Sequence, residues 1–262
     1  MGTAQARLAR HFGDEIIFAV DRDLAAIQRF SQEFHIAATE ELSKLPTDLD
    51  LSRIDLVWLT VTDSEISPTA RKLCSVLNPK TVILHTSGAL SSDAAADELP
   101  DFACGSLHPL ISCPLVTVTD LECVNHYRGV LHTFDGAPNA RNFAQILADR
   151  LESVIAEIPS ESKPLYHASA VFASNYPIVL ADIAVHLFEK CGFTRQMALN
   201  ASRRLILQCA ESLQRALPAD ALTGPAKRND VQTIEMHRKA LEQTPDLLNL
   251  YNMLYQATRK ML

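Results

Sequence analysis

Residues 54–61 read IDLVWLTV and residues 81–85 read TVILH, two short runs in which apolar side chains follow one another without alternation. Continuous apolar runs of this length predict strands buried on both faces of a parallel sheet. A third run, IIFAV at 16–20, precedes a helical segment at 24–30, and another helical segment at 67–76 separates the first two runs. This alternation predicts a doubly wound α/β fold, which binds ligands at the carboxyl ends of its strands.

The rest of the first half continues this rhythm. Further strands are predicted at 103–107, 127–132 and 154–158, with helices at 3–12 and 139–154.

From Ser162 onward the apolar residues keep helical spacing, and no segment reads as a strand. The predicted helices are 164–190, 194–216, 229–242 and 245–261. Pro177 predicts a kink or a local break in the first of them. We therefore expect an α/β domain at 1–160 and an all-helical domain at 161–262. Because the helical block carries so much apolar surface, it predicts a homodimer.

The composition narrows the class of protein. The 262 residues include 47% hydrophobic and 21% charged residues, with a net charge of −7. This acidic balance argues against nucleic acid or an anionic membrane as the main partner. We expect a cytoplasmic protein without a membrane span, because neither a signal peptide nor an unbroken run of about eighteen apolar residues is apparent. The six cysteines form no C-x-x-C pair, which predicts buried thiols and no metal site.

The first residues bear on nucleotide binding. A G-x-G-x-x-G turn lets the backbone approach a pyrophosphate at a helix N-terminus, and Gly2 fits its last glycine. Asp21 follows Gly2 at close to the expected offset of about 20 residues and suits the hydroxyls of a ribose, whereas Arg22 suits an adenine ring or a 2′-phosphate. The alternative is a charged turn, 21–23, that caps the next helix.

The first strand and first two glycines of that fingerprint are missing from this sequence. Either the true start lies upstream or the phosphate cradle is lost. Without its central strand, the neighbouring strands of the sheet are expected to pair directly or to remain frayed.

Polar residues follow two predicted strands. Val61 and Thr62 end the run at 54–61, and Thr86 and Ser87 follow the run at 81–85. We assign Val61, Thr62 and Thr86 to the cofactor, and Ser87 to the reacting groups. The alternative for Thr86 and Ser87 is an N-cap of the following helix.

Several stretches identify a family resemblance: HTSGAL (85–90), GSLHPL (105–110), LYHASAVFASNYPIVL (165–180), ALTGPAKRNDVQTIEMHRKAL (221–241) and LYNMLYQATRKML (250–262). They resemble the bacterial Rossmann-like proteins grouped as domain of unknown function 2520. More distantly, the sequence is similar to pyrroline-carboxylate reductase, prephenate dehydrogenase and 6-phosphogluconate dehydrogenase. The resemblance implies a Rossmann-like domain that binds NAD or NADP, followed by a helical domain like the C-terminal domain of 6-phosphogluconate dehydrogenase.

The resemblance to prephenate dehydrogenase points to His108, in Ser-Leu-His-Pro-Leu, as the catalytic acid or base. An imidazole titrates near neutrality and can exchange a proton while hydride moves. The alternative is a structural histidine in a turn pinned by Pro109.

The predicted helix at 164–190 carries two further catalytic candidates, His167 and Asn175, close to Tyr166 and Ser174. Hydroxyacid dehydrogenases of this architecture carry a lysine four positions before the asparagine. Val171 stands there, so we expect no lysine-dependent mechanism. The alternative is a polar network between packed helices.

Thr223, Gly224, Arg228 and Asp230 combine a turn with a helix start and are the substrate-binding candidates. Arg228 suits a carboxylate or phosphate. The alternative is an Arg228–Asp230 ion pair with ordinary capping.

Together these features predict an NAD- or NADP-dependent oxidoreductase acting on a small, polar, acidic metabolite. The chief rival is a dimeric protein that binds a metabolite or nucleotide without turnover. A third possibility is an enzyme of other chemistry in which a bound nucleotide has only a structural role. The fold alone does not distinguish among these functions.

Overall fold

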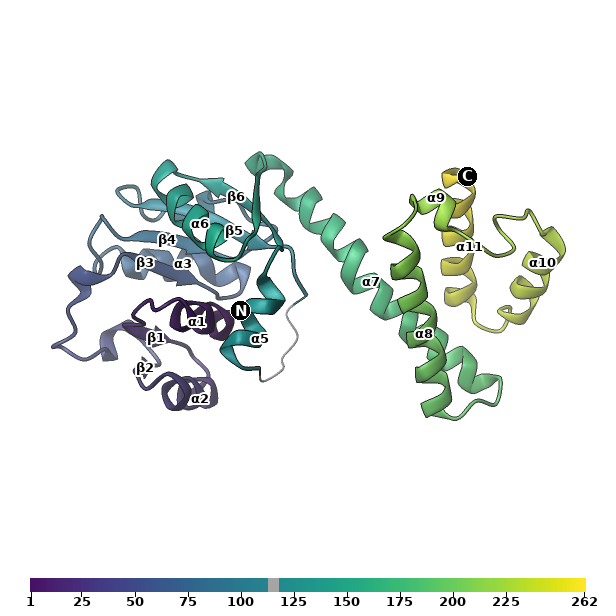
Figure 1. Cartoon of the computed structure of the whole chain (residues 1–262), viewed down its shortest axis with the longest axis horizontal. Helices are drawn as coiled ribbons and strands as arrows, with labels where there is room; N and C mark the ends of the chain where they lie inside the picture. Colours follow the sequence, from purple (N-terminus) through teal and green to yellow (C-terminus); the bar gives the residue numbers. More distant parts are fainter. Residues whose placement is uncertain (113–117) are drawn as a thin grey trace. The chain divides into compact units, whose positions relative to one another are not determined.

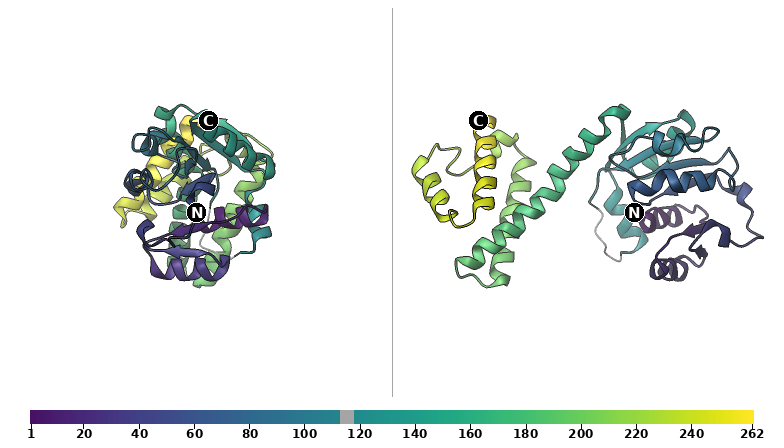
Figure 2. Two further views of the ribbon diagram at one scale, coloured as in Figure 1. Left: turned by 90° about the vertical axis from the view of Figure 1, so that its left-hand side faces the viewer. Right: turned by 180° about the vertical axis from the view of Figure 1, so that it is seen from behind.

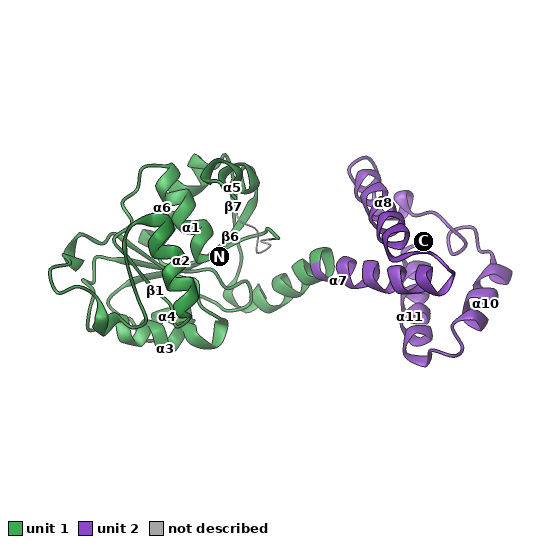
Figure 3. Cartoon of the chain, turned by 90° about the horizontal axis from the view of Figure 1, so that it is seen from below, with its two compact units in different colours: residues 1–174 green, residues 175–262 purple. Residues whose placement is uncertain are grey.

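The chain consists of two units, residues 1–174 and 175–262, and Figure 3 colours them separately. The computed structural model describes residues 1–112 and 118–262. Helix α7 (Lys163–Lys190) belongs to both units, because the division falls inside it. The predicted domain boundary at 160/161 lies just before this helix and stays a prediction.

The first unit contains a five-stranded sheet in the order β3-β4-β5-β6-β7 (Figure 1). Its strands are β3 (Leu56–Leu59), β4 (Val82–His85), β5 (Ala103–Pro109), β6 (Leu131–Gly136) and β7 (Val154–Glu157). All neighbours are parallel except β5 and β6, which run antiparallel. The predicted strand at 127–132 is therefore misplaced, because Tyr127 ends helix α5 and β6 begins at Leu131.

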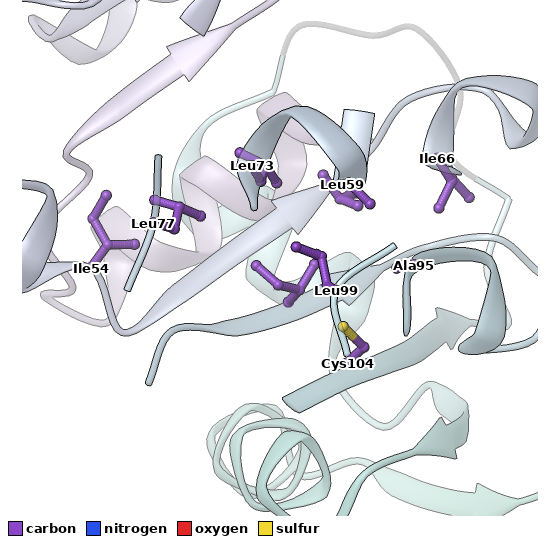
Figure 4. Packing of buried hydrophobic residues seen from close by; sticks show 10 residues of the cluster. Ile54, Leu59, Ile66, Leu73, Leu77, Ala95, Leu99 and Cys104 are labelled. Carbon is purple, nitrogen blue, oxygen red and sulfur yellow. The ribbon is translucent and has the colours of Figure 1, made fainter. Parts of the chain in front are cut away.

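Strand β4 explains why an apolar run without alternation marks this fold. Ile83 belongs to the apolar cluster that helices α3 and α4 share with one face of the sheet. Figure 4 shows other members of this cluster, among them Leu59 and Leu99. Val82 and Leu84 point to the opposite face, where they pack with helix α6. Every side chain of β4 is thus buried, as the doubly wound prediction requires.

Three main helices and several short ones connect these strands in the first unit. They are η1 (Leu42–Lys44), η2 (Leu51–Arg53), α3 (Asp63–Leu73), α4 (Asp93–Ala96), α5 (Asp120–Tyr127), α6 (Pro138–Arg150) and η3 (Ser160–Ser162). Helix α5 begins with a capping box, in which Thr119 and Glu122 satisfy each other's backbone N–H groups.

A second sheet holds only β1 (Phe18–Val20) and β2 (Ala37–Thr39), which pair in parallel. Helices α1 (Gly2–His11) and α2 (Leu24–Phe34) flank it in sequence. Of the two outcomes expected without a central strand, direct pairing does not occur, because β1 and β3 belong to different sheets in the described residues. The prediction that 16–20 is buried on both faces is wrong: β1 is three residues long, and Val20 is 36% exposed.

The second unit is entirely helical in the described residues, as the sequence predicts. After α7 come α8 (Arg195–Leu213), α9 (Pro218–Ala221), α10 (Val231–Ala240) and α11 (Pro245–Met261). Ser202 Oγ on α8 donates to the carbonyl of Ala181 on α7, which ties these helices together. The break expected at Pro177 is absent, since α7 is one continuous helix through it (Figure 2).

Helix α7 bears on the expectation that the chain has no membrane span. Residues 160–190 form one helix, in the described part of the chain, that is long and apolar enough to cross a membrane by length and composition alone. Its mean hydropathy reaches 1.5, and only 6% of that window is buried. A single such helix is weak evidence for a membrane, because a helix that packs against another protein surface has the same composition.

The cysteines also differ from expectation. Cys104 and Cys123 are buried, whereas Cys74, Cys191 and Cys209 are exposed. Cys113 lies outside the described residues.

Candidate active site

His108 and His167 lie together, although 59 positions of sequence separate them. His108 stands near the carboxyl end of β5, and His167 stands in the second turn of α7. Their ring centroids are 5.8 Å apart and the planes are nearly perpendicular. His108 Nδ1 also shares a hydrogen bond of 2.8 Å with the Tyr166 hydroxyl. The structure brings these two candidate residues together, while their catalytic roles stay a prediction.

Gly88 completes this cluster from the loop that follows β4. A Cβ built on Gly88 would lie 2.5 Å from His167 Nδ1 and 2.9 Å from His108 Nε2. Any side chain there would displace the imidazoles, so glycine lets the loop backbone approach both rings. His167 Nδ1 is buried and makes no hydrogen bond within the residues that the structure describes. Two imidazole nitrogens therefore converge on one small space beside the loop.

Ser87 has the capping role that was the alternative to chemistry. Its Oγ accepts hydrogen bonds from the N–H groups of Ala89 (3.2 Å) and Leu90 (2.9 Å), so it caps a turn in the loop. Its own N–H donates to His85 Nδ1 at 3.3 Å, and His85 Nε2 donates to the carbonyl of Ser91 at 3.0 Å. Ser87 therefore shapes the loop that carries Gly88.

Lys163 is the residue that sequence reasoning missed. It opens α7, is fully buried, and its Nζ donates to the Ser87 carbonyl at 3.2 Å and to Ser106 Oγ. Val171 occupies the position at which hydroxyacid dehydrogenases of this architecture carry a lysine. Lys163 nevertheless places an ammonium beside Ser87, in the loop that carries Gly88. Its place four residues before His167 was the available signal, because positions i and i+4 share one helix face.

Burial sets the charge of the cluster. Burial, followed by the charges of His167 and Lys163, lowers the pKa of His108 to about 4. Burial also lowers the pKa of His85 to about 4 and that of Lys163 to about 8. At neutral pH the imidazoles of His85 and His108 are thus neutral, and the ammonium of Lys163 carries most of its positive charge. No ion pair within the described residues involves Lys163, whose hydrogen-bond partners are a carbonyl and a hydroxyl.

Five of the six cofactor candidates line one cavity of about 2720 Å³ in the first unit. They are Gly2, Asp21, Arg22, Val61 and Thr62, and the lining does not include Thr86. Thr86 instead donates its backbone N–H to the Leu59 carbonyl at 3.3 Å.

Gly2 meets the steric requirement of a nucleotide-binding glycine. A Cβ on Gly2 would lie 2.7 Å from Thr60 Oγ1, just beyond the carboxyl end of β3. The start of α1 therefore approaches the strand as closely as a glycine permits, which is one of the tasks of a glycine in this turn.

The charged turn after β1 keeps both of its interpretations. Asp21 Oδ1 accepts the N–H of Asp23 at 2.9 Å, and Asp23 caps α2 by accepting from Ala25 N. The helix cap is thus Asp23, which leaves the second oxygen of Asp21 for a ligand. Arg22 is 77% exposed and lies 3.4 Å from Glu65, a weak pairing at the surface.

The remaining candidates belong to the second unit, so their relation to the histidine cluster stays a prediction. Asn175 stands in α7 and is exposed, and Thr223 and Gly224 form a turn in which Gly224 has φ +92°. Asp230 caps α10 by accepting from Thr233 N (3.1 Å) and Thr233 Oγ1 (2.7 Å). The capping alternative for Asp230 is therefore the one observed. No ion pair with Arg228 accompanies it among the described residues.

Comparison with known proteins supports the fold. A Bacteroides fragilis protein with the provisional name NADP oxidoreductase superposes with a TM-score of 0.78 at 20% identity, covering 98% of this chain and 93% of that one. Protein TM1727 from Thermotoga maritima gives 0.72 at 23% identity, over 98% and 94%. Pyrroline carboxylate reductase from Plasmodium falciparum, with NADP bound, gives 0.59 at 11% identity, over 100% and 95%.

No curated protein matches the sequence. One family profile does, that of a domain of unknown function (DUF2520), over residues 130–258. The architecture is that of the Rossmann-type dehydrogenases with a helical C-terminal part. Over residues 130–258 this chain is therefore similar to the DUF2520 family.

Proposed function

We propose that this protein is an NAD- or NADP-dependent oxidoreductase that acts on a small, polar, acidic metabolite. One observation carries the proposal: the residues that follow β3, β4 and β5 gather at one edge of a dehydrogenase-type sheet. Thr62 lines the large cavity, while Gly88 and His108 form the histidine cluster. Because parallel strands place their carboxyl ends at the same edge, a cofactor site and a proton-transfer site adjoin there.

Residues of the cavity suit the cofactor. The start of α1 offers unpaired N–H groups to a pyrophosphate, and Gly2 allows the close approach. The free oxygen of Asp21 suits ribose hydroxyls, whereas Arg22 suits a 2′-phosphate, so both NAD and NADP remain candidates. When bound, the nicotinamide ring would accept or give the hydride.

His108 is the residue proposed to move the proton. It is neutral at pH 7, and Tyr166 holds its Nδ1 side. When a substrate hydroxyl is oxidised, Nε2 takes the hydroxyl proton as the hydride leaves the adjacent carbon. His167 lies beside this nitrogen and is placed to hydrogen-bond the same substrate oxygen.

The preference for an acidic substrate rests on Lys163. The hydrogen-bond partners of this buried ammonium are neutral, and the attraction of the Asp135 and Asp63 carboxylates is weaker than the cost of its burial. The ammonium therefore creates a positive potential around it. An anionic substrate beside His108 would lower the energy of this arrangement. Arg228 of the second unit stays the proposed ligand for a carboxylate or phosphate group, as expected from its sequence position.

The homodimer and the cytoplasmic location are part of the same proposal. Apolar residues stay exposed along α7, such as Phe172 (70%) and Ile178 (67%), and a second copy of the chain would cover them. Ile178→Glu should then convert a dimer to a monomer in sedimentation analysis. A parent protein that sediments as a monomer would contradict this part.

The cofactor proposal is tested by titrating the protein with NADH and with NADPH. Trp58 is the single tryptophan of the chain and lines the cavity, so its emission should be quenched when either nucleotide binds. Gly2→Asp should abolish this quenching, because the new side chain meets Thr60 and its charge repels phosphate. His11→Asp is the control, since it introduces an acidic side chain at an exposed position at the other end of α1, outside the lining of the cavity.

Turnover is tested with small carboxylic acids that carry a hydroxyl or an amine, by following the absorbance of the reduced nicotinamide. Saturable binding with turnover that His108→Gln removes would support the proposal. Binding without turnover of any of these acids would favour the non-catalytic rival. Failure of both nucleotides to bind would refute the proposal.

A further inference from the structure

The hydrogen bond between Tyr166 and His108 can run in either direction, and the direction decides what His108 can do. Tyr166 Oη lies 2.8 Å from His108 Nδ1, and the two rings meet edge to face with their centroids 5.6 Å apart. A phenol can both donate and accept, whereas a neutral imidazole donates from one nitrogen and accepts at the other. If Nδ1 donates to Tyr166, Nε2 is left with a free lone pair; if Tyr166 donates, Nε2 carries the proton. Only the first arrangement allows Nε2 to take a proton.

Thr133 places a second hydroxyl near this phenol. It lies directly opposite His108 in the antiparallel pairing of β5 with β6, so the two side chains leave the same face of the sheet. Thr133 is 2% exposed, and its buried Oγ1 makes no hydrogen bond of ordinary geometry within the described residues. The hydroxyl still acts on Tyr166, because burial raises the pKa of the phenol and Thr133 opposes that rise. A buried hydroxyl without a partner is costly, so this one requires an explanation.

The phenol of Tyr166 has a single proton to place, and Thr133 decides where that proton can go. When His108 Nδ1 donates to Tyr166 Oη, the O–H group turns away from the imidazole and requires another acceptor. Thr133 Oγ1 offers its unused lone pairs to this group. With an apolar residue in place of Thr133, the acceptor that remains in contact with the phenol is Nδ1. The phenol would then donate to Nδ1 and keep the proton of His108 on Nε2.

The charge of Lys163 favours a free lone pair on Nε2. Lys163 Nζ donates to the Ser87 carbonyl at 3.2 Å, and the next residue is Gly88, where a Cβ would lie 2.9 Å from His108 Nε2. At neutral pH Lys163 is mostly charged, and its charge is one of those that lower the pKa of His108. A positive charge on this side attracts a lone pair and repels an N–H dipole. The proton of a neutral His108 is therefore favoured on Nδ1, next to Tyr166.

We propose that Tyr166 and Thr133 are positioning residues that fix the tautomer of His108. Nδ1–H donates to Tyr166 Oη, the Tyr166 O–H donates to Thr133 Oγ1, and Nε2 keeps its lone pair towards the space beside Gly88. This inference rests on the proposed function, because removal of a proton from a substrate hydroxyl requires an unprotonated Nε2. All three groups are neutral before the reaction. The imidazolium that forms when Nε2 takes the proton keeps both hydrogen bonds, so none of these groups has to rearrange.

The test reads the tautomer of His108 in the full chain, without nucleotide or substrate, from two-bond proton–nitrogen NMR correlations of nitrogen-labelled histidines at pH 7. His108→Gln identifies the signals of His108 among the nine histidines, because they disappear in that variant. The native protein should carry the proton on Nδ1. Thr133→Val keeps the shape of the side chain but lacks the hydroxyl, and it should move the proton to Nε2. Thr133→Ser is the matched control, which retains the hydroxyl and should keep the native tautomer.

His85 is an internal reference for folding, since its Nε2 donates to the Ser91 carbonyl and its signals should stay unchanged in every variant. Tyr166→Phe is a second, independent variant, which removes the phenol and should also move the proton to Nε2. The proposal is overturned if the native protein carries the proton on Nε2, if Thr133→Val or Tyr166→Phe keeps it on Nδ1, or if Thr133→Ser moves it as valine does. Because neither nucleotide nor substrate is present, these outcomes are independent of the tests of cofactor binding and turnover.

Discussion

Replacing Lys163 by methionine should change how the stability of the first unit depends on pH. Burial lowers the pKa of this lysine from 10.5 to about 8. Between pH 8 and pH 10.5 the unfolded chain therefore holds a proton that the folded chain has released. Stability rises with pH wherever the unfolded state binds more protons, so the native protein should gain stability across this window. Lys163→Met lacks the titrating group and should lack this gain.

The size of the effect follows from the pKa difference. A change of one in pKa corresponds to about 1.4 kcal/mol, so the native protein should gain roughly 3 kcal/mol relative to Lys163→Met between pH 8 and pH 10.5. Near pH 7 the difference between the two proteins should be smaller. There the variant removes the donor to Ser106 Oγ and one of two donors to the Ser87 carbonyl, which still accepts from Ser106 Oγ at 3.1 Å, but it also removes the cost of burying a charge.

The measurement is urea unfolding followed by tryptophan emission, which reports the first unit because Trp58 is the only tryptophan. Titration of tyrosines and thiols affects both proteins alike and cancels in the difference. Lys80→Met, at an exposed position, controls for the loss of a surface lysine and should parallel the native curve. A native-minus-variant difference that stays flat, or falls, from pH 8 to pH 10.5 would refute the assignment of a buried, charged lysine.

Two further predictions concern the histidine cluster. The pKa of His108, lowered from 6.5 to about 4, means that the unfolded chain binds a proton first as the pH falls through this window. Between pH 6.5 and pH 4, His108→Gln should therefore lose roughly 3 kcal/mol less of its free energy of unfolding than the native protein does. Urea unfolding that shows the same loss of stability with falling pH for both proteins would contradict this. Gly88→Ala places a Cβ 2.5 Å from His167 Nδ1 and should destabilise the first unit by about 1–3 kcal/mol, with changed imidazole NMR signals. Unchanged stability and signals would contradict the packing described.

Much of the fold could be predicted because its signals are local. The apolar run of β4 and the helical spacing of α8 and α11 each identify an element without reference to the rest of the chain. Strand β6 was misplaced because Tyr127 and His132 have strand-like neighbours, whereas the capping box at Thr119 begins a helix that ends at Tyr127.

The candidate site also contains residues that local sequence signals identify and residues that they do not. His108 was proposed through the resemblance to prephenate dehydrogenase, and His167 through its place on the face of a predicted helix; the structure places the two rings side by side. Lys163 was missed because its role depends on Ser87 and Ser106, which are remote in sequence. Ser87 and Asp230 proved to hold turns and helix ends, since short polar side chains beside unpaired N–H groups bond to them first.

The contacts of Lys163 also bear on the order in which the chain is made. Its hydrogen-bond partners precede it by 57 and 76 positions, so all strands of the first unit have been synthesised before this lysine leaves the ribosome. Until then, Ser106 Oγ lacks the ammonium that later donates to it, and the Ser87 carbonyl has only its hydrogen bond from Ser106 Oγ, which disfavours early completion of the domain. A fragment ending at residue 160 would remain in that state permanently, whereas one that includes the first turns of α7 would not.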